Sequence, residues 1–137
     1  MSFYEKFKPD VYTIKDFNNW VIVLREKQVT LGSAVIILKN EYSNIGLASQ
    51  NDFCEFPEVV NWYEQKCREL FDAEKFNYLA AMMKDNFVHF HAFPRYSKAI
   101  KINGTTWKDE YWPGIVDTKA EKCPIDTLNE LLDLFRK

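Results

Sequence analysis

Two histidines separated by a single residue are the side chains of this sequence best suited to chemistry. His89 and His91 are the only histidines of the 137-residue chain. They lie in an apolar, strand-like stretch, where residues two apart share one face of a sheet. A neutral imidazole near pH 7 can attack phosphorus, hold a metal ion or accept a hydrogen bond. The pair by itself therefore leaves three alternatives open: a structural role, a metal site and nucleophilic catalysis.

An antiparallel hairpin is the element expected to position the histidines. Two apolar stretches, 76–83 and 87–93, are each long enough for a strand, and the polar residues 84–86 predict a tight connection. Pro94 cannot donate a hydrogen bond to a sheet, so the second strand is expected to end there. Arg95 then lies at the strand end, and its planar, permanently charged guanidinium suits phosphate.

A metal site would need more than the two histidines. The third ligand would have to be a carboxylate or a cysteine, and no second cluster has suggestive spacing. The three cysteines, Cys54, Cys67 and Cys123, are odd in number and form no CxxC pair. This usage predicts neither a disulfide framework nor a zinc finger and fits a cytoplasmic protein. We expect no structural metal and no cofactor.

Two early strands and a long helix precede the hairpin. The aliphatic runs 20–24 and 33–38 predict a pair of strands. Ser49 is positioned to cap a helix, with Asp52 bonding back to it. Pro57 predicts either a kink or a short helix followed by a longer one that starts at Pro57. Six apolar residues at spacings of three and four define the buried face of this helix, which runs to about residue 72: Phe53, Phe56, Val60, Tyr63, Cys67 and Leu70.

A final helix and the order of the elements set the fold class. Pro124 begins a helix with a regular apolar stripe, and Asn103-Gly104 predicts a turn within a further short hairpin. Strands paired along the sequence, with helices between and after them, predict an α+β fold. The length and the absence of a linker predict one domain over residues 1–137.

Composition excludes several classes of function. Hydrophobic residues make up 47% and charged residues 28%, which is typical of a folded domain. The net charge of −2 argues against binding of DNA or RNA through the overall charge of the protein. No apolar run approaches the roughly 20 residues that cross a bilayer, so we expect no membrane partner. With only four glycines, the chain has no phosphate-binding glycine loop.

The residues around the histidines resemble a known family. The stretch 77–96 is similar to the signature of the histidine triad (HIT) superfamily, His-φ-His-φ-His-φ-φ with φ apolar, often followed by Pro-Arg. The Gln-Val-Thr-Leu-Gly-Ser segment at 28–33 and the pair Trp112-Pro113 resemble bacterial HIT proteins described as diadenosine tetraphosphate hydrolase-like. The resemblance extends roughly from Trp20 to Pro113.

The resemblance implies a fold and a chemistry. It implies an antiparallel meander sheet of about five strands, one long helix, a C-terminal helix and a homodimer. It also implies a hydrolase or transferase that acts on nucleotides or dinucleoside polyphosphates. His89 would attack the α-phosphorus to form a covalent nucleotidyl-histidine, and His91 would hydrogen-bond the phosphate oxygens.

Two positions depart from the family pattern. Phe87 occupies the place of the first histidine of the triad, and Ser33 stands where an earlier strand often carries another histidine. These departures predict slow or narrowed catalysis, or a nucleotide-binding module without turnover. A metal-binding protein using His89 and His91 is the remaining alternative.

The candidate substrate-binding residues complete the expectations. For Asn77, on the expected partner strand, two alternatives are open. Its side chain contacts ribose or phosphate, or it makes a structural hydrogen bond. Arg25, near the end of an early strand, could face the nucleotide, but we expect a solvated surface arginine. The substrate-binding set is Asn77, Arg95, Phe87 and Ser33.

Overall fold

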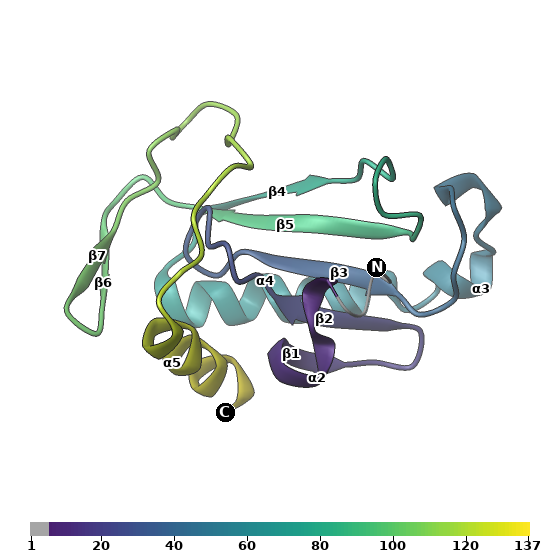
Figure 1. Cartoon of the computed structure of the whole chain (residues 1–137), viewed down its shortest axis with the longest axis horizontal. Coiled ribbons are helices and arrows are strands. Elements are labelled where there is room, and N and C mark those ends of the chain that lie inside the picture. The colour runs from purple at the N-terminus through teal and green to yellow at the C-terminus, as the bar shows by residue number, and fades with distance from the viewer. Residues whose placement is uncertain (1–5) are drawn as a thin grey trace.

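A five-stranded antiparallel sheet forms the centre of the computed structural model, which describes residues 6–137 (Figure 1). The strand order is β1-β2-β3-β5-β4, so β5, which carries both histidines, is hydrogen-bonded on both sides. The fold is α+β, as the sequence predicted. The strands are β1 (Thr13–Asp16), β2 (Trp20–Leu24), β3 (Ala34–Leu38), β4 (Lys75–Leu79) and β5 (His89–Arg95).

Helix α4 (Phe56–Phe71) covers one face of the sheet (Figure 1). It follows the short helix α3 (Gln50–Phe53), which begins with a capping box. Ser49 Oγ accepts from the Asp52 backbone at 3.2 Å, and the Asp52 carboxylate accepts from the Ser49 backbone at 2.8 Å. The prediction of a short helix followed by a longer one is confirmed. The longer helix begins at Phe56 and tolerates Pro57 because the first turn has no backbone acceptor for its nitrogen.

The remaining elements surround this sheet and helix. The C-terminal helix α5 (Ile125–Arg136) begins after Pro124 as expected, and Arg136 donates to the Thr13 and Val11 carbonyls of the N-terminal part. The hairpin predicted at Asn103-Gly104 is present. The other elements are α2 (Pro9–Tyr12), the 3-10 helix η1 (Ile45–Leu47), β6 (Ile100–Ile102) and β7 (Thr105–Trp107). Within residues 6–137, no helix has the length and apolarity needed to cross a bilayer.

The hairpin that carries the histidines has shorter strands and a longer connecting loop than predicted. β4 ends at Leu79 and β5 begins at His89, so residues 80–88 form a loop. The prediction of strands over 76–83 and 87–93 with a tight connection at 84–86 was therefore wrong. The apolar run continues past Leu79, but the pairing of β4 with β5 ends there, opposite His91, whereas β5 goes on pairing with β3 as far as His89.

Pro94 lies within β5 rather than ending it, which corrects the second expectation for this strand. It pairs with Phe76 of β4. The last residue of β5 with a β3 partner is Ala92, opposite Ala34. The Pro94 nitrogen faces the side where β3 has ended, so the strand loses no ladder hydrogen bond there.

Candidate functional site

The two histidines project from β5 onto the sheet face that α4 does not cover. Phe90, which points the other way, contacts Phe56 of α4 with ring centroids 5.2 Å apart. The His89 and His91 rings lie side by side, 5.1 Å apart and nearly perpendicular. The alternation along the strand thus brings both imidazoles together, as predicted.

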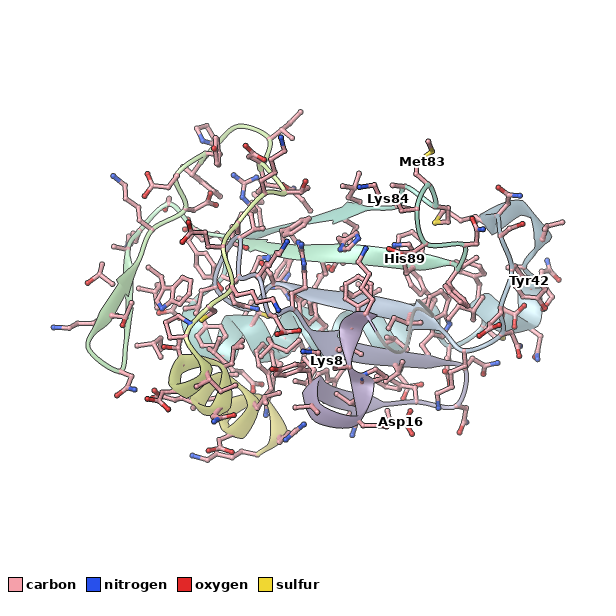
Figure 2. The ribbon with its side chains drawn as sticks, in the orientation of Figure 1. Lys8, Asp16, Tyr42, Met83, Lys84 and His89 are labelled. Atoms are coloured by element: carbon pink, nitrogen blue, oxygen red, sulfur yellow. The ribbon has the colours of Figure 1, made fainter. Side chains whose placement is uncertain are left out.

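The ring of His89 is buried and oriented by the backbone. Its side chain is on β5 (Figure 2), and the residue is 3% exposed. Its Nδ1 donates to the Phe87 carbonyl at 2.6 Å. Because a carbonyl can only accept, the proton lies on Nδ1, and the neutral ring carries its lone pair on Nε2. Phe87 therefore contributes to the site through its peptide group.

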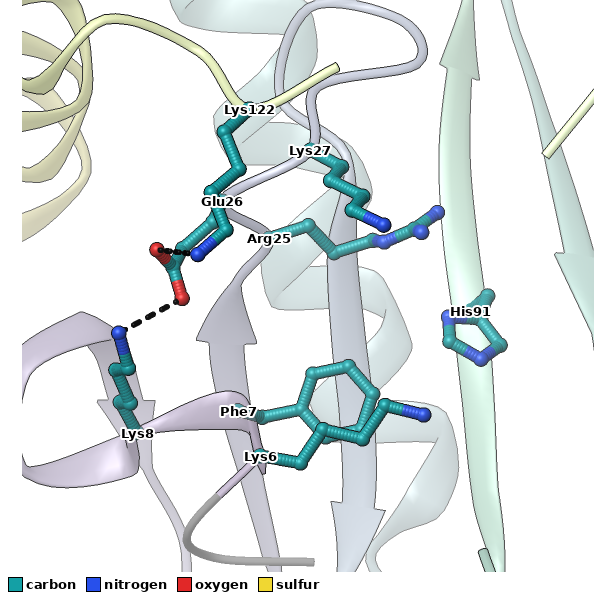
Figure 3. Close-up of a pocket in the computed structure, with 8 residues that line it drawn as sticks. All are labelled: Lys6, Phe7, Lys8, Arg25, Glu26, Lys27, His91 and Lys122. Carbon is teal, nitrogen blue, oxygen red and sulfur yellow. Dashed lines mark ion pairs between the residues drawn. The ribbon is translucent and has the colours of Figure 1, made fainter. Parts of the chain in front are cut away.

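His91 lines a pocket of about 510 Å³ on the same face, within the range of roughly 300–1,000 Å³ that is typical of ligand sites. We call it the basic pocket because five cationic side chains and one carboxylate line it. Figure 3 shows the lining side chains coming from the N-terminal segment, the end of β2, β5 and the segment that precedes α5. Its lining residues are Lys6, Phe7, Lys8, Arg25, Glu26, Lys27, His91 and Lys122.

Arg25 lines the pocket, which is the less favoured of the two alternatives given for it in the sequence analysis. Its guanidinium carbon lies 5.4 Å from the centre of the Phe93 ring, and burial lowers its pKa. Among the described residues, its buried Nη1 has no hydrogen-bond partner. Figure 3 shows the side chain extending toward β5, where His91 projects. The expectation of a solvated surface arginine was wrong.

The position of Arg25 follows from strand register. Val23 pairs with Val35 of β3, and Val35 pairs with His91 of β5. Paired residues share a face, so Arg25, two residues beyond Val23, shares the face of His91. The sequence carries no local signal for this position of Arg25, because it depends on the pairing of three strands.

His91 is held in its neutral form. Burial, and after it the positive charge of Arg25, lower the pKa of its imidazole from 6.5 to about 3. Its Nδ1 is buried and lacks a hydrogen-bond partner among the described residues. The ring therefore presents an uncharged polar group beside the guanidinium over the whole physiological pH range.

Several lysines of the basic pocket form ion pairs with carboxylates. Glu26 lies 3.4 Å from Lys8 and 3.7 Å from Lys122, as the dashed lines of Figure 3 mark. Lys6 lies 2.8 Å from Asp85 in the loop between β4 and β5. A larger anion would have to compete with these carboxylates for the lysines.

Arg95 and Asn77 lie on the same sheet face but bind each other instead of meeting the histidines. Arg95 Nη1 donates to the Asn77 side chain at 2.6 Å. Its Nε and Nη2 donate to the two carboxylate oxygens of Asp109 at 2.6 and 3.1 Å. Asn77 and Arg95 line a second cavity of about 480 Å³ with Trp112 and Pro113. The structure therefore does not bring these two candidates to the basic pocket.

Ser33 belongs to a structural turn. It is fully buried, its Oγ donates to the Thr30 carbonyl at 2.6 Å, and it accepts from the Thr30 amide at 3.0 Å. Gln28 closes the same turn through the Ser33 carbonyl and the Gly32 amide. The segment 28–33 thus sets the β2–β3 connection, and Ser33 does not line the basic pocket.

No third metal ligand accompanies the histidine pair in the part of the chain that the structure describes. Within residues 6–137, no three histidine, cysteine, aspartate or glutamate side chains lie close enough to hold one ion. A metal at His89 and His91 would have to take further ligands from elsewhere.

Comparison with known proteins shows the fold. No family model matches the sequence, and no curated protein matches it. A histidine triad nucleotide-binding protein of Sulfolobus tokodaii matches with a TM-score of 0.73 at 15% identity, covering 96% of this chain and 89% of that one. A histidine triad protein of Sinorhizobium meliloti gives 0.71 at 16% identity, over 93% and 90% of the two chains. One of Marinobacter aquaeolei gives 0.70 at 16% identity, over 98% and 95%. The chain has the histidine triad fold.

Proposed function

We propose that this chain binds a nucleotide through its phosphate groups in the basic pocket. The observation that carries the proposal is the juxtaposition of Arg25 and His91, each with a buried polar nitrogen that lacks a partner within residues 6–137. Buried donors of this kind are costly unless a ligand satisfies them. The Sulfolobus tokodaii protein of the same fold is described as nucleotide-binding, which supports a nucleotide as the ligand.

The lining charges favour phosphate over other anions. The Arg25 guanidinium presents a planar fork of donors, which suits two phosphate oxygens at once. Lysines around it add positive charge without fixed geometry, which suits a flexible chain of phosphates. His91 stays uncharged, so it contributes a polar contact and no repulsion of a neighbouring cation.

Hydrolysis through His89 is the second candidate function, and the Nδ1 hydrogen bond to Phe87 favours it. With Nδ1 protonated, the Nε2 lone pair attacks the α-phosphorus, the bond to the leaving phosphate oxygen breaks, and that oxygen keeps the electron pair. Water then attacks the same phosphorus, and the phosphorus–nitrogen bond breaks to return a neutral His89 and a nucleoside monophosphate. His91 would hydrogen-bond the phosphate oxygens during both steps. Phe87 supplies no imidazole, so this chemistry would proceed with one histidine fewer than the triad.

We also propose a homodimer, which the resemblance to HIT proteins implies. β4 lies at one edge of the sheet, with its outer backbone groups directed away from β5. A second copy pairing along this edge would satisfy those groups. Analytical ultracentrifugation at micromolar concentration should then show a dimer, and a monomer at all concentrations would refute it.

Calorimetry and intact-mass spectrometry test the function together. ATP and diadenosine tetraphosphate should bind with an affinity that falls as salt is added. A panel of dinucleoside polyphosphates and nucleoside phosphoramidates should leave a nucleotidyl mass on the protein, and His89→Gln should abolish the adduct while binding persists. Binding without any adduct or product supports the non-catalytic module, and absence of binding refutes the primary proposal.

A further inference from the structure

The N-terminal segment Lys6–Lys8, here called the strap, lies across the histidine pair. Lys6 is tied to Asp85 in the loop after β4, and Lys8 is tied to Glu26 just beyond β2. Between them, the Phe7 ring lies 6.5 Å from the His89 ring and 6.0 Å from the His91 ring. The strap is therefore held at both ends by ion pairs, with an aromatic ring over the two imidazoles.

The strap stands in the way of any phosphate that is to react at His89. A nucleophile and its target must approach to about 3–3.5 Å before a bond can form. His89 is 3% exposed and faces the side of the sheet on which Phe7 lies. The opposite face is filled by α4, so the approach must come from the Phe7 side, and the ring has to move.

The two ion pairs that hold the strap break readily. The side chains of Lys6 and Lys8 are 44% and 48% exposed, and ion pairs of such lysines contribute little and are screened by salt. Lys8 also holds a left-handed backbone conformation with φ of 50°, which is unfavourable for a residue with a side chain. The two ion pairs that hold Lys6 and Lys8 are thus weak, and the left-handed backbone conformation of Lys8 also opposes the closed position.

The cations that fasten the strap also line the basic pocket. Lys6 and Lys8 both line this pocket, and Figure 3 shows the Lys6 side chain reaching toward His91 and the Lys8 side chain reaching toward Glu26. A ligand with several phosphates can therefore compete with Asp85 and Glu26 for the two lysines. A single phosphate carries fewer charges and oxygens than a chain of phosphates, so it competes less well for two lysines at once.

We propose that the strap determines substrate specificity: a polyphosphate takes Lys6 and Lys8 from their carboxylates, Phe7 leaves the histidine pair, and His89 is exposed, whereas a monophosphate leaves the strap closed. The inference rests on the proposed binding of phosphates in the basic pocket. It makes access to His89 depend on how many phosphates the ligand carries.

Acylation of the two histidines by diethyl pyrocarbonate, located by tandem mass spectrometry, tests the strap. Inorganic tripolyphosphate and orthophosphate serve as probes at matched ionic strength. Tripolyphosphate should protect His91, which lines the pocket, and increase acylation of His89 about two- to five-fold, the range expected when a surface ion pair is lost. Orthophosphate should protect His91 without exposing His89.

Variants of the strap give the same test without a ligand. Asp85→Asn releases Lys6 and leaves every pocket residue intact, so it should raise His89 acylation about two- to five-fold. Phe7→Ala should raise it further. Asp133→Asn, the same change on an exposed position of α5, should leave it unchanged.

The outcomes separate this inference from the proposed function. If tripolyphosphate protects His91 but His89 acylation stays constant or falls, the strap inference is overturned and phosphate binding stands. If His91 is not protected, phosphate binding in the basic pocket is overturned. Should Phe7→Ala fail to fold, Asp85→Asn decides the matter: acylation of His89 at the wild-type rate in that variant overturns the strap.

Discussion

Arg95 is held by Asp109 in a two-pronged ion pair, with Nε and Nη2 donating to separate carboxylate oxygens at 2.6 and 3.1 Å. The two side chains are 4% and 1% exposed. The Asp109 carboxylate also accepts from the Tyr96 amide at 3.2 Å. This pair joins the end of β5 to the segment that follows β7. The Arg95 guanidinium, which the sequence analysis assigned to phosphate binding, is therefore bound to Asp109.

Removing Asp109 should destabilise the protein strongly. Asp109→Ala leaves the Arg95 charge buried without its partner, which costs about 3–5 kcal/mol of unfolding free energy. Urea unfolding of the variant and the wild type measures this difference. The double replacement Arg95→Met with Asp109→Leu should cost less than Asp109→Ala. An effect under about 1 kcal/mol for Asp109→Ala would contradict a structural role for the pair.

Removing Arg25 should weaken nucleotide binding without unfolding the chain. A hydrogen bond to a charged group contributes about 1.5–3 kcal/mol, so Arg25→Met should lower the affinity for ATP roughly 10- to 100-fold. Titration calorimetry measures the loss. The matched control is Lys98→Met, because Lys98 is exposed and outside the basic pocket. Equal affinities for the two variants would show that Arg25 does not bind the phosphates.

The low pKa of His91 should make the fold sensitive to mild acid. The imidazole takes up a proton near pH 6.5 in the unfolded chain but only near pH 3 in the folded one. The folded state is therefore favoured above pH 6.5, and its unfolding free energy falls by about 1 kcal/mol for each pH unit below that value. His91→Phe removes the titration and should flatten the loss between about pH 7 and about pH 5 in urea unfolding. Parallel losses in both proteins would refute the shift.

The turn between β2 and β3 should require a glycine at position 32. Gly32 has a φ of 91°, and a Cβ there would lie 3.3 Å from Pro94 Cγ. Gly32→Ala should therefore lower the unfolding free energy by about 1–3 kcal/mol. Gly46→Ala is the control, since its Cβ would meet no atom within 4 Å, and a change within about 0.5 kcal/mol is expected. Similar effects at the two sites would rule out strain at the turn.

The order of elements could be predicted because each has a local signal. Apolar spacing defines α4, the Ser49 capping box marks α3, and Pro124 marks the start of α5. The extent of the histidine hairpin could not be predicted in this way. Residues 80–83 continue the apolar run of β4, but the pairing with β5 ends at Leu79, opposite His91, while β5 itself continues to His89 beside β3. Apolar character alone does not show where strand pairing stops.

The shared face of His89 and His91 follows from their spacing alone, whereas the rest of the pocket depends on tertiary structure. β2 and β3 are buried along their whole length, so their sequences show no alternation that would assign Arg25 to a face. The position of Phe7 over the imidazoles has no periodic signal at all. The register across the sheet places Arg25, whereas the path of the N-terminal segment places Phe7.

The backbone carbonyl that orients the His89 ring has a consequence for the side chain at position 87. A peptide oxygen is present whatever side chain the residue carries, so exchanging an imidazole for a phenyl group there removes one proton donor while the aim of the neighbouring ring stays the same. Phe87→His would accordingly place three histidines at alternate positions, 87, 89 and 91, with the hydrogen bond that orients the His89 ring still available.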